Sequence, residues 1–241
     1  MPPPGGSGGS MYQYLYAIAD LLPAAWRPPE ASVGGPVVLR RLGDLVVLAS
    51  PLDLLPEANA RTLALHHDVV ATTLDAAAVV PFRFGTIVPT ADLDAWLGAH
   101  AQLVRTTLGQ LRGCVEMSVK LLRLHCGHSI ERTCRECADG APGVVQLREL
   151  AERLVRQAGI ERWRYRSAGG GSNVVGSVAF LLPRSEVDSF LTRIAPIASR
   201  APGIAVVPTG PWPPYSFVPS FDRFPLPRLS EPGRDAGRLA G

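Results

Sequence analysis

The stretch GPWPPYSFV, at residues 210–218, constrains the fold of this chain more than any other. Three prolines alternate here with the rings of Trp212, Tyr215 and Phe217. Proline fixes φ, lacks an amide donor and pushes the preceding residue toward extended geometry, so this segment cannot form a helix. We therefore expect a stiff extended segment, here called the strap (residues 209–218), that lays its rings on an apolar surface.

Two interpretations of the strap are open. Its rings could form a packing clamp that closes a domain, because buried aromatic side chains dominate the energetics of cores. They could also form an exposed docking segment for a partner. We expect the clamp, with Arg83 as a polar neighbour, since a guanidinium stacks well on aromatic rings.

Arg83 itself lies in a second short aromatic segment, VVPFRFGT, at residues 79–86. Strand alternation would place Phe82 and Phe84 on one side and Arg83 on the other. An arginine between two buried rings usually satisfies a carboxylate or a set of carbonyls. A partner-binding role for Arg83 is the alternative.

The composition is typical of a folded protein, and its balance of charges indicates no particular class of partner. The chain has 241 residues, of which 46% are hydrophobic and 19% charged, and this is ample for a buried core. A net charge of +3 gives no reason to expect nucleic-acid binding. No apolar run approaches membrane-spanning length, and no secretory signal is visible at the N-terminus. We expect a cytoplasmic protein with neither a membrane nor a nucleic acid as partner.

The first half is expected to form a separate α+β unit over residues 11–112, after a disordered lead or linker at residues 1–10. The patterns predict a strand, a hairpin that turns at Gly43–Asp44, and two helices capped by Asn59 and Thr90. The expected bounds are 11–18, 37–42 and 45–50 for the strands, 59 to about 80 for the first helix, and 90–112 for the second. The apolar face of the first helix should carry Leu63, His67, Val70, Leu74 and Ala77.

The second half, residues 113–219, predicts the element order β-α-β-β-α-β, which is the ferredoxin-like arrangement. Expected strands are 114–124, 161–166, 174–182 and 204–207, with helices at 147–158 and after a cap at Ser185. The predicted fold class is therefore α+β with two domains, an N-terminal α+β unit and a C-terminal ferredoxin-like domain, followed by a flexible tail at 220–241. In the strand at 161–166 the arginines alternate with the aromatic residues and face the other way, so base stacking on this sheet is not expected.

A Cys/His-rich insert at residues 125–142 is the one local cluster with metal-ligand chemistry. Cys134 and Cys137 form a CxxC pair, the natural two-ligand bite for zinc, and Cys126 and His128 could complete a site. No second CxxC or HxxxH follows at the usual spacing, so reduced free thiols or a redox-active pair are alternatives. A structural zinc ion is a hypothesis here, and we expect no other cofactor.

The sequence offers no basis for catalysis. It contains no GxSxG, HExxH or paired-carboxylate motif, and the glycines at 169–171 precede a strand instead of opening a helix. His66 and His67 lack a sequence context that supplies an acid and a nucleophile, so packing or surface roles are expected for them. We therefore expect a protein that is not an enzyme.

Three segments, in order, resemble signatures of the gas vesicle GvpL/GvpF family. They are VVPFRFGT at 79–86, GCVEMSVKL at 113–121 and the strap, so the resemblance spans roughly residues 11–218. It implies an accessory or minor structural protein of gas vesicle assembly that binds the shell protein and other accessory Gvp proteins, at the gas vesicle or in the cytoplasm. It does not imply a zinc site. The alternative is a metal- or ligand-sensing regulatory module built on a ferredoxin-like domain.

Overall fold

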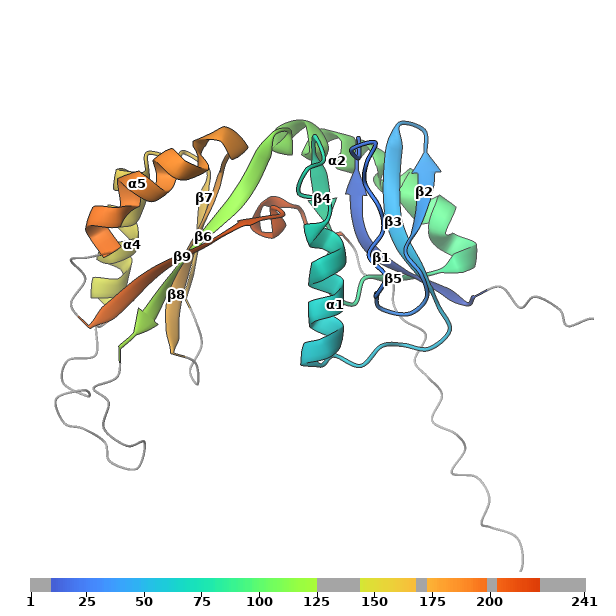
Figure 1. Ribbon diagram of the computed structural model, residues 1–241, viewed down its shortest axis with the longest axis horizontal. Helices are drawn as coiled ribbons and strands as arrows, with labels where there is room; N and C mark the ends of the chain where they lie inside the picture. The colour runs from blue at the N-terminus through green and yellow to red at the C-terminus, as the bar shows by residue number, and fades with distance from the viewer. Residues whose placement is uncertain (1–9, 125–143, 168–172, 199–202, 222–241) are drawn as a thin grey trace, which may run out of the picture.

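The computed structural model describes residues 10–124, 144–167, 173–198 and 203–221. They form two separate β-sheets, each with helices packed against it, arranged along the long axis of the molecule (Figure 1). All the strand pairings in both sheets are antiparallel. The predicted mixture of helices and strands is confirmed, and the long helix α2 (Leu93–Leu111) leads from the first sheet to the second along the chain.

The first sheet is centred on a strand that is buried on both faces. Tyr14 and Tyr16 of this strand pack with residues of α1, whereas Leu15 and Ile18 pack on the other face with residues of α2. Two helices therefore enclose the sheet between them. The strand order is β2-β3-β1-β4, and β5 also pairs with β1. The elements are β1 (Tyr12–Ala19), β2 (Val38–Leu42), β3 (Leu45–Leu52), α1 (Ala60–Ala71), β4 (Val79–Pro81) and β5 (Ile87–Pro89).

Helix α1 begins as predicted and ends earlier than predicted. Asn59 caps it with a reciprocal capping box to Thr62. The helix stops at Ala71, because the hydroxyls of Thr72 and Thr73 donate to carbonyls of the last turn and the chain then forms tight turns. The predicted apolar face was therefore wrong in part: His66, Val69 and Val70 are the buried residues, while Leu63 is 47% exposed.

The segment after β4 also differs from the strand that its alternation suggested. Phe82 packs in the apolar cluster beside α2, and Phe84 packs in the cluster on the opposite face of the sheet. The two rings diverge because the chain turns here, with Gly85 at φ +82°. Thr90 does not cap α2, since its hydroxyl donates to the carbonyl of Ser10 and the residues 90–92 form a 3-10 turn.

The second sheet has helices α4 and α5 packed on one of its faces. Its strand order is β7-β8-β6-β9, and its element order is the β-α-β-β-α-β predicted from the sequence. Ser185 lies in a 3-10 turn and makes no side-chain cap. Strand β9 runs five residues past the predicted end at Val207. The elements are β6 (Cys114–Arg123), α4 (Val144–Ala158), β7 (Trp163–Ser167), β8 (Val174–Pro183), α5 (Val187–Ala198) and β9 (Ile204–Trp212).

A buried hydrogen-bond chain joins α1 to the segment after β4. The Nε2 atom of His66 lies 3.1 Å from the carbonyl of Phe82, which can only accept, so Nε2 carries the proton. Nδ1 of the same ring then accepts from the Tyr14 hydroxyl at 2.9 Å, and that oxygen accepts from the Gly85 amide at 3.2 Å. These hydrogen bonds engage both ring nitrogens of a neutral imidazole. Burial lowers the pKa of His66 to about 4. The expected packing role of His66 is thus confirmed.

This burial predicts an acid-sensitive fold. In the unfolded chain a histidine titrates near pH 6.5, so between about pH 6.5 and 4 the unfolded state binds the extra proton. The free energy of unfolding should therefore decrease as the pH is lowered through this range, by about 3 kcal/mol in all. Urea unfolding of the parent and of His66→Gln at several pH values measures it, because other titrating groups cancel in the difference. Parallel pH profiles for the two proteins would contradict this assignment.

Candidate interaction site

The strap leaves the second sheet and reaches the first unit. Its residues as far as Trp212 complete β9 and pair with β6, with a register irregularity opposite Glu116 and Ser118. Gly210 is required here, since it has φ +124° and a Cβ would lie 2.9 Å from the Glu116 carbonyl oxygen. A 3-10 turn, η3 (Tyr215–Phe217), then lies between the two halves of the molecule (Figure 1).

The three rings of the strap contact both units. The Tyr215 ring stacks on His67 of α1, with ring centroids 6.2 Å apart, and joins the apolar cluster on that side of the first sheet. The Trp212 ring lies 5.1 Å from the same imidazole. Phe217 packs against the opposite cluster, beside α2, and the guanidinium groups of Arg164 in β7 and of Arg162 just before it lie 5.7 and 6.0 Å from its centroid. Each ring is half-buried.

Glu116 anchors the strap to β6. Its side chain is on the face of β6 that the alternation predicted, but it is only 6% exposed because the strap covers it. The carboxylate accepts from the Ser216 amide at 2.7 Å and from the Ser216 hydroxyl at 2.9 Å. Burial raises the pKa of Glu116, and the hydrogen bonds from Ser216 oppose this. The sequence analysis did not assign this residue to a site, although its position as the one acidic residue of β6 was the available signal.

Arg83 does not have the surroundings that the sequence suggested. It is exposed, and although its backbone carbonyl accepts from the Thr86 amide and hydroxyl, none of the hydrogen bonds, ion pairs or ring contacts within the described residues involves its side chain. Arg162, just before β7, and Arg164, within it, lie over the Phe217 ring of the strap, and Arg83 does not. Phe82, the residue before Arg83, contacts Phe221 just beyond the strap, with ring centroids 5.3 Å apart.

Polar contacts reinforce the junction between the two sheets. The Arg184 guanidinium, at the end of β8, donates to the carbonyl of Leu74 and lies 3.9 Å from the Asp75 carboxylate. Arg162 donates to the carbonyl of Gln110, near the end of α2, at 2.7 Å. These contacts tie the second sheet to the segment after α1 and to the end of α2. The strap is therefore one of several links between the two sheets.

The proposed metal ligands cannot be placed. Cys126, His128, Cys134 and Cys137 all lie outside the described residues, and the zinc hypothesis stays a prediction. Within the described ranges no group of three or more His, Cys, Asp or Glu side chains is arranged to hold a metal ion. Likewise, no helix in the described part of the chain has both the length and the apolar character needed to cross a membrane.

Comparison with known protein families identifies the family whose sequence pattern includes these segments. The sequence model described as "Gas vesicle synthesis protein GvpL/GvpF" matches residues 13–159 and 144–219, which together cover most of the chain. The fold and the matched segments thus define a gas vesicle protein. The chain belongs to the GvpL/GvpF family, and the resemblance seen in its three short segments is confirmed.

Individual relatives agree with this assignment. The chain is 28% identical to gas vesicle protein F of Streptomyces sp. (strain CB03234), over 86% of this chain and 100% of that protein. It is also 28% identical to gas vesicle protein F2 of Halobacterium salinarum, over 68% of this chain and 70% of the relative. In fold it is similar to the crystal structure of GvpF from Anabaena sp. PCC7120, with a TM-score of 0.68, 17% identity and coverage of 89% and 99%. GvpF from Microcystis aeruginosa gives a TM-score of 0.62 at 16% identity, covering 86% and 99%.

The Glu116–Ser216 contact predicts that one carboxylate controls the order of the strap. Glu116→Ala leaves the Ser216 amide without its acceptor, so exchange of that amide hydrogen should accelerate about tenfold or more. Glu116→Gln keeps an oxygen acceptor and should retain most of the protection. Ser118→Ala, on the same face of β6, is the matched control. Equal exchange rates at Ser216 in Glu116→Ala and the parent would show that the contact does not hold the strap.

The clamp interpretation predicts that truncating a strap ring destabilises the free protein. Trp212→Ala removes the contact with His67, and a loss of about 2 kcal/mol would lower Tm by about 5 °C in a chain of this length. Trp163→Ala provides a matched control, because Trp163 is an exposed tryptophan of the same sheet. Melting of Trp212→Ala within about a degree of the parent would favour a docking segment instead.

Proposed function

We propose that this chain acts in gas vesicle formation as a non-enzymatic accessory or minor structural protein that binds the shell protein and other Gvp proteins. Membership of the GvpL/GvpF family supports the role in gas vesicle formation. In this proposal the protein works at the gas vesicle and in the cytoplasm. Its second sheet, with α4 and α5, serves as a ferredoxin-like domain, and the strap links that domain to the first unit.

The observation that carries this proposal is the position of the strap. Its rings lie at the junction of the two sheets, and each keeps part of its surface exposed while the other part is packed. Aromatic and arginine side chains are the residues most enriched at protein–protein interfaces. Arg83, exposed and two residues beyond the end of β4, adds a guanidinium that no described residue engages.

The buried polar groups support a binding role over a catalytic one. His66 is held by Tyr14 and by the Phe82 carbonyl, and Glu116 is held by Ser216. These side chains are enclosed and satisfied by groups of the chain itself, which is typical of structural polar groups. A general base needs access to a substrate proton, and neither His66 nor Glu116 offers it.

The proposal predicts that the shell protein is retained by the tagged chain and that Arg83 contributes to the contact. Arg83→Gln should weaken retention of co-expressed shell protein several-fold without lowering Tm, since the side chain has no partner to lose within the described fold. Arg41→Gln, which removes one exposed charge from β2, is the control and should bind as the parent does. Failure of the parent to retain the shell protein would refute shell binding, and equal retention by Arg83→Gln would remove Arg83 from the interface.

A further inference from the structure

The face of the second sheet that points away from α4 and α5 carries a group of basic side chains. The strand register places Arg166, Ser177 and Lys120 in one row across β7, β8 and β6. The adjacent row holds Arg164, Ala179 and Ser118. Residues at the alternate positions, such as Val119, Val178 and Tyr165, pack against the helices, so these two rows face the other way.

The basic groups of this face form no ion pair within the described residues. Lys120 and Arg166 are exposed, and no hydrogen bond or ion pair among the described residues engages either side chain. The side-chain hydrogen bond described for Arg164 goes to the carbonyl of the adjacent Trp163, and its guanidinium lies 5.7 Å from the Phe217 ring of the strap, so this group borders the strap. The only carboxylate on the four strands is that of Glu116, which is buried and bound by Ser216. This carboxylate lies on the same face and interacts electrostatically with Arg166, so it offsets part of the positive charge, and the exposed Lys120, Arg164 and Arg166 leave an excess.

The spacing of these groups fits paired carboxylates. Adjacent strands lie about 4.8 Å apart, so the backbones of Arg166 and Lys120 are separated by about 10 Å, with the small Ser177 between them. Both long side chains can converge on one carboxylate above that serine, and a guanidinium binds such a group with two hydrogen bonds. The row of Arg164 lies about 6.7 Å further along the strands, which is the spacing of residues i and i+2 in an extended peptide.

We propose that this face, defined by Lys120, Arg164 and Arg166, binds an acidic peptide segment of a partner protein. The charge complementarity selects carboxylates, and the floor of small residues lets an extended chain approach the sheet. A nucleic acid is disfavoured, because Tyr165 of β7 packs toward the helices, and the rings of Trp212 and Phe217 beside this face already pack against the first unit. The inference does not depend on binding of the shell protein.

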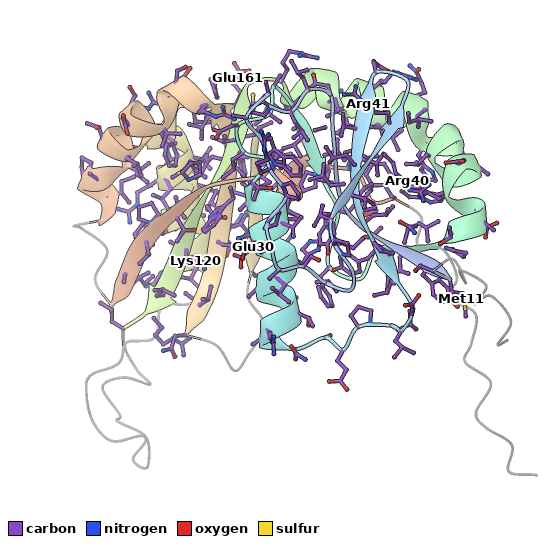
Figure 2. The ribbon with its side chains drawn as sticks, turned by 45° about the vertical axis from the view of Figure 1, so that its right-hand side comes forward. Met11, Glu30, Arg40, Arg41, Lys120 and Glu161 are labelled. Carbon is purple, nitrogen blue, oxygen red and sulfur yellow. The ribbon has the colours of Figure 1, made fainter. Side chains whose placement is uncertain are left out.

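A fluorescein-labelled peptide of alternating glutamate and serine tests the proposal by fluorescence anisotropy at low salt. The full chain should bind it, and K120Q/R166Q should bind it about tenfold more weakly. The matched control is R40Q/R41Q, which removes two positive charges from β2 of the first unit. Figure 2 shows that Arg40 and Arg41 lie on the other half of the molecule from Lys120. This control should bind the peptide as the parent does.

Charge reversal supplies an independent readout. K120E/R166E should no longer bind the acidic peptide and should bind the corresponding lysine–serine peptide instead. Misfolding would abolish binding and would not reverse the charge preference, so this gain reports on the face itself. The proposal is overturned if the parent fails to bind the acidic peptide, or if K120Q/R166Q and R40Q/R41Q weaken binding equally, since the effect would then be one of net charge. Tighter binding of a single-stranded oligothymidylate than of the acidic peptide would replace it with a nucleic-acid site.

Discussion

The contact between Glu116 and Ser216 fixes the strap, which is one of the links that join the second sheet to the first unit. A carboxylate with this little exposure is costly to bury, and the two donors of Ser216 offset that cost only while the strap stays in place. Fixing Ser216 also fixes its neighbours Tyr215 and Phe217, whose rings enter the two apolar clusters on opposite faces of the first sheet. A single buried polar group in β6 thereby sets where two aromatic anchors lie.

Elements with a strong and uniform apolar pattern were predictable from the sequence. The stripe of α2 is buried throughout, and α4 ends before Gly159 at φ +62°, as its pattern predicted. The predicted helix boundaries were wrong where a hydroxyl side chain could either cap a helix or form a different hydrogen bond. Thr90 and Ser185 have the character of helix caps, yet each lies in a 3-10 turn that precedes its helix, and the hydroxyls of Thr72 and Thr73 end α1 early.

The candidate site was predictable as a set of segments but not as a set of contacts. Short-range patterns predicted an extended aromatic strap, and the structure is extended as far as Trp212 but forms a 3-10 turn at Tyr215–Phe217. They could not indicate that Arg162 and Arg164, distant in sequence, would lie over Phe217 while Arg83 points to solvent. Nor could alternation alone reveal that Glu116, on the face opposite the helices, would be covered by a segment about a hundred residues later.

The apolar cluster beside α2 is shared by the two halves of the chain. Leu181 of β8 is buried in it with Leu111 and Phe82, and Cys114, Phe217 and Val218 pack against its edge. The second half thus completes a core that the first half begins. Separating the chain after α2 would expose this apolar surface on both fragments. The two sheets are therefore expected to unfold in one cooperative transition, because each half excludes water from part of the other's core.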